Sequence, residues 1–289
     1  MSFINFLRSN ILYLIWFTFY FAFAWLIFGA NRNSLLIVSI IYIISITVAL
    51  SPLGEMLLRF IEGCRLPKTE REKNYLLPLF EEAYENAKDV NPSLNKGINI
   101  YIMDAMYVNA FAMGRKTVAV TRGAMETFNA EELKGIIAHE LGHITHGHTK
   151  ALLLTNIGNI LFTAIVFVLR LIVQLADSIA GITAYFNIMG IVFKVITFIT
   201  GIFFYVSVFV FVNLGELILS LNSRANEMQA DKFAYTTGFG KQLIDSLYLL
   251  QKISLTANVK PYERLKASHP HIASRIEQLE RLESAENEE

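Results

Sequence analysis

The apolar positions of this chain are gathered into long uninterrupted blocks. Two blocks without charge lie near the N-terminus, one between Arg8 and Arg32 and the next between Arg32 and Glu55. Two more follow the middle of the chain, at residues 151–169 and 195–215. A helix that crosses a membrane needs about 20 apolar residues. The pattern therefore predicts two membrane hairpins with four spans.

The later hairpin contains a further uncharged segment, residues 178–193, which includes two glycines and an asparagine. We interpret this segment as re-entrant or interfacial. The orientation follows from basic residues after the second span, because Lys and Arg accumulate on the cytoplasmic side of a membrane. These residues are Arg59, Arg65, Lys68, Arg71 and Lys73. With an even number of spans, both termini and the polar middle of the chain are expected in the cytoplasm.

The polar parts of the chain have the spacing of a mixed α+β domain. The sequence predicts strands at 98–103 and 117–120 and a helix over 130–143. Asn129 caps that helix and Glu132 follows at the third position, which is the pattern of a capping box. Two further helices are expected: one over 73–88, and one near the C-terminus with an apolar stripe of Ile272, Ile276 and Leu279.

These blocks divide the chain into four parts. We expect a membrane hairpin at 1–54 and a second hairpin at 151–221. The polar parts, 55–150 and 222–289, are expected to form one cytoplasmic domain together. The composition agrees, since 54% of residues are apolar and only 17% are charged, against about 25% charged in soluble domains.

Charge and cysteine content exclude some classes of protein. The net charge is zero, so there is no basic surplus to bind nucleic acid. The single cysteine, Cys64, has no second cysteine in the chain with which to form a disulfide. This fits a reducing compartment.

The informative chemistry is the run His139-Glu140-Leu141-Gly142-His143. On a helix, positions i and i+4 lie on one face, so His139 and His143 can bind one zinc ion. Glu140 projects to the same side and can act as general base on a water molecule that the zinc activates.

A catalytic zinc ion takes three protein ligands and keeps one position open. One class of such sites adds a third histidine shortly after the motif, but His146 and Thr149 occupy the positions of its glycine and histidine. Another class takes a glutamate from a later helix, and Glu227 fits that role. Asp231, one turn further on, fits as the acceptor for the N–H of a ligand histidine.

Three other histidines allow more than one interpretation. His146 and His148 can be extra ligands or surface residues, and we interpret them as surface or interfacial. His269, which precedes a proline, is either an ordinary loop histidine or a donor that stabilises the oxyanion of a tetrahedral intermediate. The sequence leaves both roles of His269 open.

Four blocks of sequence occur together and in order. They are NAFAMG at 109–114, AHELGH at 138–143, SRANEMQAD at 223–231 and SHPHIASRI at 268–276. In these blocks and in the order of its spans, the chain resembles the HtpX family of membrane zinc endopeptidases. That family is related more distantly to the CAAX prenyl-protein endopeptidases.

The resemblance implies a mainly α-helical integral membrane protein with a zincin-like α+β catalytic domain that carries a small β-sheet. It implies one zinc ion per chain, held by His139, His143 and Glu227, with Glu140 as the base. It also implies a place in the cell membrane (inner or plasma), a cytoplasmic catalytic domain, and unfolded or damaged membrane proteins as substrates. By analogy with other zincins, a strand near Asn109, Ala110 and Phe111 would pair with extended substrate.

Two alternatives use the same metal site. A CAAX-type peptidase would act on prenylated tails, but four spans in 289 residues are too few for the large membrane enclosure of that family. A non-catalytic membrane scaffold that retains a zinc site is the other alternative. The intact Glu140 argues against it.

Overall fold

The computed structural model describes most of the chain and divides it into two compact units. The described residues are 15, 17–26, 28–156, 160–186, 188–256 and 272–286. The first unit, called the helical unit, comprises Met1–Ser45 and Gly158–Leu221. The second, called the mixed unit, comprises Ile46–Ile157 and Asn222–Glu289.

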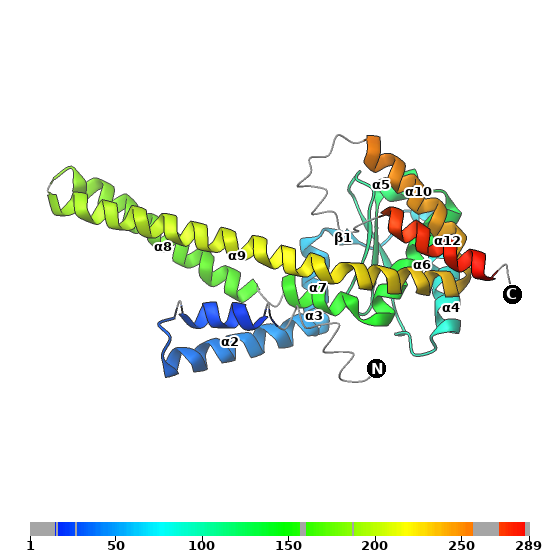
Figure 1. Cartoon of the computed structure of the whole chain (residues 1–289), viewed down its shortest axis with the longest axis horizontal. Coiled ribbons are helices and arrows are strands. Elements are labelled where there is room, and N and C mark those ends of the chain that lie inside the picture. Colours follow the sequence, from blue (N-terminus) through cyan, green and yellow to red (C-terminus); the bar gives the residue numbers. More distant parts are fainter. Residues whose placement is uncertain are drawn as a thin grey trace. The chain divides into compact units, whose positions relative to one another are not determined.

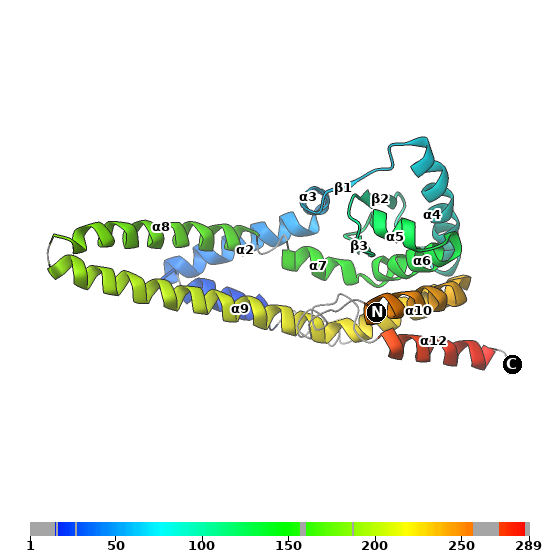
Figure 2. The same ribbon diagram turned by 90° about the horizontal axis from the view of Figure 1, so that it is seen from above.

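The helical unit consists of apolar helices. A helix at Phe17–Leu26 precedes α2 (Arg32–Leu50), whose last residues belong to the mixed unit. Later in the chain, α8 (Ile160–Ala184) and α9 (Ile188–Ala234) run antiparallel and side by side (Figures 1 and 2). They are joined by a tight turn that follows directly on the end of α8.

Segment 178–193, which we interpret as re-entrant or interfacial, forms the end of α8 and the start of α9 within the described residues. Its relation to a membrane stays a prediction. Neither glycine breaks a helix: Gly190 allows close packing, whereas a side chain at Gly181 would make only an ordinary contact. A Cβ at Gly190 would meet the backbone of Thr183, and a Cβ at Gly181 would lie 3.7 Å from Lys194 Nζ. The ion pair of Lys194 Nζ with Asp177 Oδ2, at 2.6 Å, links the two helices further.

Two helices within the described residues are long and apolar enough to cross a membrane. They are Arg32–Leu50, with a mean hydropathy of 2.3, and Phe167–Ala184, with a mean hydropathy of 1.6. Phe17–Leu26 and Ile188–Ile202 are apolar but shorter. Arg32–Leu50 lies within the second expected span, whereas Phe167–Ala184 begins where the uncharged stretch 151–169 ends. The first, third and fourth spans therefore stay predictions with the bounds given above.

The mixed unit contains a four-stranded sheet in the order β1-β2-β4-β3. β2 and β4 are parallel, and the other two pairs are antiparallel. The strands are β1 (Cys64–Arg65), β2 (Asn99–Met103), β3 (Ala110–Met113) and β4 (Thr117–Thr121). The two predicted strands are present as β2 and β4. β1 and β3 are too short to give an alternating pattern that sequence reasoning can recognise.

The other elements of the mixed unit are helical. They are α3 (Pro52–Ile61), α4 (Glu70–Val90), α5 (Arg122–Thr127), α6 (Ala130–His146), α7 (His148–Asn156), the end of α9, the π-helical turn η1 (Tyr235–Phe239), α10 (Gly240–Thr256) and α12 (Ile272–Glu286). α6 is the central helix, because it packs against α4, α10, β3 and β4. All residues from Leu133 to Gly142 are buried in consequence.

Both ends of α6 are fixed by local interactions. Asn129 Oδ1 accepts from the backbone N–H of Glu132 at 2.9 Å, and Glu132 Oε2 accepts from the N–H of Asn129 at 2.9 Å. The predicted capping box is therefore confirmed. The helix ends at Gly147, whose φ of 77° lies in the left-handed region that favours glycine. These two ends set the position in which α6 presents its side chains.

Candidate metal centre

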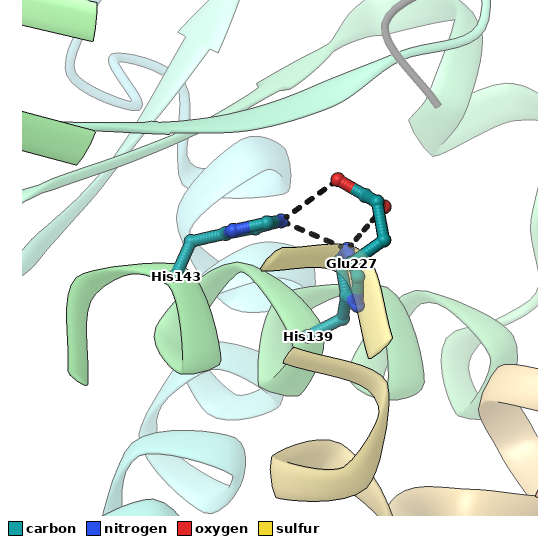
Figure 3. Close-up of side chains that lie close together, drawn as sticks. All are labelled: His139, His143 and Glu227. Atoms are coloured by element: carbon teal, nitrogen blue, oxygen red, sulfur yellow. Dashed lines mark hydrogen bonds and ion pairs between the residues drawn. The ribbon is translucent and has the colours of Figure 1, made fainter. Parts of the chain in front are cut away.

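Three side chains from two helices bring metal-binding atoms together in the mixed unit. His139 and His143 extend from α6 and Glu227 from α9 (Figure 3). The Nε2 atoms of the two histidines are 3.2 Å apart. Glu227 Oε1 lies 3.3 Å from His143 Nε2, and Oε2 lies 3.4 Å from His139 Nε2. One donor atom of each residue lies within 4.8 Å of the other two.

A glycine allows these two helices to approach. Gly142 lies between the two histidines, and a Cβ there would be only 3.0 Å from Ala230 Cα on α9. Real Cβ atoms rarely come so close, so a larger residue would push α9 away from α6. Because Ala230 and Glu227 are three residues apart on one helix, this close approach brings Glu227 to the histidines.

The donor set fits a divalent transition metal. It combines two imidazole nitrogens with one carboxylate oxygen, and all three converge on one point. Catalytic metal sites in hydrolytic enzymes have three protein ligands of these types, and water or substrate takes the fourth position. The chemistry of the donors therefore agrees with a resident metal ion held by His139, His143 and Glu227.

Asp231 lies where the sequence predicts an acceptor. Its Oδ1 is 2.9 Å from His139 Nδ1, so the other ring nitrogen faces the Glu227 carboxylate. Such a contact fixes the orientation and the tautomer of a ligand histidine.

Burial and charge shift the pKa values of this pair in opposite directions. Burial lowers the pKa of His139, and so does the charge of Arg275, but hydrogen bonds to Asp231 and Glu227 outweigh both and raise it to about 9. Burial raises the pKa of Asp231, but Arg275 and His139 outweigh it and bring it to about 2. Asp231 is therefore ionised, and a metal ion would compete with a proton for His139.

Arg275, on α12, belongs to the site, although the sequence analysis did not predict it as a site residue. Its Nη2 and Nε bond to the two oxygens of Asp231 at 2.6 and 2.8 Å. Its Nη1 lies 3.1 Å from Glu227 Oε2. A signal was available, since Arg275 lies three residues after Ile272 and four before Leu279, on the apolar stripe of its helix. A charged residue on a buried stripe needs a buried partner.

Glu140 is 3% exposed and lines a cavity of about 620 Å³ together with His139. Most of the lining is apolar and comes from α6, α10 and the segment before β3. It includes Val108, Ala110, Phe128, Ile136, Leu243, Leu247, Leu250 and Ile253. Glu140 therefore lies beside both the metal donors and an apolar cavity. It can accept a proton from a water molecule while the cavity binds an apolar side chain.

The expected substrate residues lie at the end of the sheet. Ala110 and Phe111 belong to β3, which is the last strand in the order, and Asn109 precedes it. Asn109 and Ala110 line the cavity beside Glu140. Phe111 is half-buried and packs against a different cluster, which contains Met113. Their role in binding substrate stays a prediction.

The remaining histidines have different surroundings. His269 lies outside the described residues, so its two interpretations stay open. His146 is exposed. His148 is half-buried and in contact with the ligand set, because its Nδ1 is 3.0 Å from His143 Nδ1. Its interpretation as a surface or interfacial histidine stays a prediction, and its contact with His143 was not expected. Burial, followed by the neighbouring His143, lowers the pKa of His148 to about 3.

Known proteins match the chain over most of its length. Residues 72–283 match the profile of "Peptidase family M48". The chain is 27% identical to the "Protease HtpX" of Chromohalobacter salexigens, over 87% of this chain and 86% of that protein. It is 30% identical to the "Protease HtpX" of Pseudomonas syringae pv. tomato, over 74% of this chain and 73% of that protein. It also resembles the crystal structure of S. mikatae Ste24p with a TM-score of 0.48 and 19% identity, covering 94% of this chain and 63% of that one.

A helix with the HEXXH pattern and a glutamate from a later helix define a metallopeptidase. The expected HtpX resemblance is confirmed by the comparisons. The chain belongs to peptidase family M48, among the HtpX proteases.

Proposed function

We propose that this metalloprotease is a membrane-anchored zinc endopeptidase that hydrolyses peptide bonds in misfolded or damaged membrane proteins. The observation that carries the proposal is the convergence of His139, His143 and Glu227 beside the buried carboxylate of Glu140. We assign one zinc ion per chain to these three ligands. When bound, zinc polarises a peptide carbonyl and lowers the pKa of water toward ~7.

The side chains around the ligands have separate tasks in this proposal. Glu140 takes the proton of the attacking water and delivers it to the leaving amine. Asp231 holds His139 in one tautomer through its 2.9 Å contact with Nδ1. Arg275 neutralises the buried charge of Asp231 and Glu227, since it contacts both.

The cavity supports a preference for apolar substrates. It is lined by Glu140, which must lie close to the leaving amine if it returns the proton there. An apolar cavity at that position favours a large apolar side chain on the residue whose amine departs. Misfolded membrane proteins expose such residues in abundance, which agrees with the proposed substrate class.

Membrane anchoring is supported by the apolar helices. The stretches Arg32–Leu50 and Phe167–Ala184 each have the length and hydropathy of a span. We propose a multi-pass protein of the cell membrane whose mixed unit, with the metal site, lies in the cytoplasm. The basic residues after α2 favour this orientation.

The test of the function uses detergent-purified full-length protein, an unfolded protein such as casein, and mass spectrometry of the products. Glu140→Gln is expected to lower the rate by at least about 10²–10⁴-fold, because it removes the base, and to keep its zinc. Glu131→Gln, an exposed position on the same helix, is the matched control and should keep both activity and zinc.

Each alternative has its own outcome. Proteolysis that survives Glu140→Gln would contradict the assignment of the base. Zinc without hydrolysis of any unfolded protein would favour a scaffold. Cleavage of a prenylated peptide in preference to unmodified membrane protein would favour a CAAX-type peptidase. Cleavage sites without enrichment of large apolar residues after the cut bond would contradict the role of the cavity.

A further inference from the structure

His148 contacts a metal ligand but does not belong to the donor set. It is the first residue of α7 and follows Gly147, which ends α6. Its Nδ1 is 3.0 Å from His143 Nδ1, and its Nε2 is 3.1 Å from Gln229 Oε1 on α9. One imidazole therefore bridges a metal ligand to a neutral amide on the helix that supplies Glu227.

The metal ligand His143 and the amide of Gln229 determine which nitrogen of His148 carries a proton. His143 directs Nε2 to Glu227 and His139. If Nε2 binds a metal, the proton of the neutral ring is on Nδ1, which then donates. An amide oxygen only accepts, so His148 Nε2 carries the proton that Gln229 receives. Nδ1 of His148 is then unprotonated and can accept from His143.

We propose that His148 is a positioning residue for the metal ligand His143. Its Nδ1 accepts the hydrogen bond that His143 Nδ1 donates, and Gln229 holds His148 in the tautomer that can accept. The two ligand histidines are thus supported differently: His139 by the carboxylate of Asp231, and His143 by a neutral imidazole. This inference rests on the proposed zinc site.

A purely structural role for His148 makes a different prediction. Its ring packs edge-to-face on His143, with centroids 5.2 Å apart, and stacks on His146 at 5.5 Å. If packing were its only role, a phenylalanine ring would serve and a smaller polar side chain would not. If the hydrogen bond is its role, the order reverses.

Two substitutions at position 148 separate these roles. His148→Phe keeps a ring and removes the acceptor, whereas His148→Asn removes the ring and retains an acceptor oxygen near the place of Nδ1. Supporting contacts of this kind typically change metal affinity by about 10–100-fold. We expect His148→Phe to weaken zinc binding by that factor and His148→Asn to remain close to wild type.

The same logic applies to Gln229, which is exposed and therefore open to substitution without unfolding. Gln229→Glu retains an acceptor and should preserve zinc affinity. Gln229→Met removes the acceptor that fixes the tautomer and should weaken zinc binding. His146→Leu is the matched control: it removes a neighbouring imidazole that does not reach His143 within the described structure, and it should leave the affinity unchanged.

The measurement uses metal-free full-length protein in detergent, titrated with zinc against a competing chelator. The visible absorption of the cobalt-substituted protein gives a second readout, because it reports ligand geometry directly. A changed spectrum in His148→Phe and Gln229→Met, and a wild-type spectrum in His148→Asn, support the proposal.

Other results overturn it. Wild-type zinc affinity in His148→Phe, or an equal loss in His148→Asn and His148→Phe, would leave His148 a packing residue. If His148→Phe does not fold, unchanged affinity in Gln229→Met leads to the same conclusion. Absence of zinc from the wild type would overturn the proposed function together with this inference, so the two failures are distinct.

Discussion

The guanidinium of Arg275 is buried between the carboxylates of Asp231 and Glu227, close to the ligand His139. A metal ion at the donor set would bring positive charge to the same carboxylates. The arginine and the metal therefore neutralise overlapping groups, and the arginine acts alone while the site is metal-free. Its removal leaves buried charge without a partner, which is costly.

We expect Arg275→Met to lower the free energy of unfolding of the metal-free protein by about 3–5 kcal/mol. Zinc should restore part of the loss, because it supplies charge beside Glu227. Denaturant unfolding with and without zinc measures both effects. Arg281→Met, an exposed position on the same helix paired with Glu277, is the control. Equal stability of the metal-free Arg275→Met and wild-type proteins would contradict the expectation.

At the scale of elements, an ionic cluster joins α4 to the sheet. Glu72, in the first turn of α4, accepts from Arg65 of β1 at 2.7 and 3.0 Å and from Arg122 of α5 at 3.0 Å. Asp104, directly after β2, bonds to both arginines. Glu72 also closes a capping box with Thr69. The cluster therefore holds the start of α4 against three other elements.

This cluster makes stability depend on pH in the acid range. Hydrogen bonds, first of all from Arg65, lower the pKa of Glu72, and those from Arg65 and Arg122 lower the pKa of Asp104 to about 2. Groups with a lowered pKa stabilise the folded state above their unfolded values of about 4, and the stability is lost as pH falls through the folded values.

We therefore expect the melting temperature of the metal-free protein to fall below pH ~4, and to fall less in Glu72→Gln and Asp104→Asn. At neutral pH both variants should melt lower than the wild type. Glu70→Gln, whose partner is the exposed Lys73, is the control. If the melting temperature of the wild type and of all three variants falls equally below pH ~4, the ionic cluster is not the cause of the acid sensitivity.

The sequence predicted best where local chemistry decides the structure. Asn129 and Glu132 define the start of α6 by themselves, and two histidines four residues apart must share a face. Arg275 and His148 could not be assigned in this way, because their partners lie far away in the chain or across a helix end. Segment 178–193 shows a second limit, because glycine has two uses: it can interrupt a helix, and it can let two helices pack closely. Only the tertiary partner decides between these uses.

At the scale of the whole molecule, the proposed topology places residue 96 and the turn after α8 on opposite sides of the membrane. In intact cells, Phe186→Cys should react with an impermeant maleimide and Lys96→Cys should react only after the cells are opened. Both positions are exposed. The native Cys64 should give little background, because burial raises the pKa of its thiol to about 11.

The opposite labelling pattern would reverse the orientation. Protection of Phe186→Cys both before and after opening would mean that the turn stays within the bilayer and that α8 and α9 do not cross it completely. In either case the metal site is unaffected, because all its ligands belong to the mixed unit.

The mixed unit is interrupted by residues 158–221, and this has a consequence for biosynthesis. His139 and His143 leave the ribosome before the interruption, whereas Glu227 and Arg275 leave after it. A nascent chain therefore carries only two of the three donors until the later apolar helices have been made. The donor set is therefore incomplete until residues 158–221 have been synthesised, and the growing polypeptide cannot bind a metal with all three donors before then.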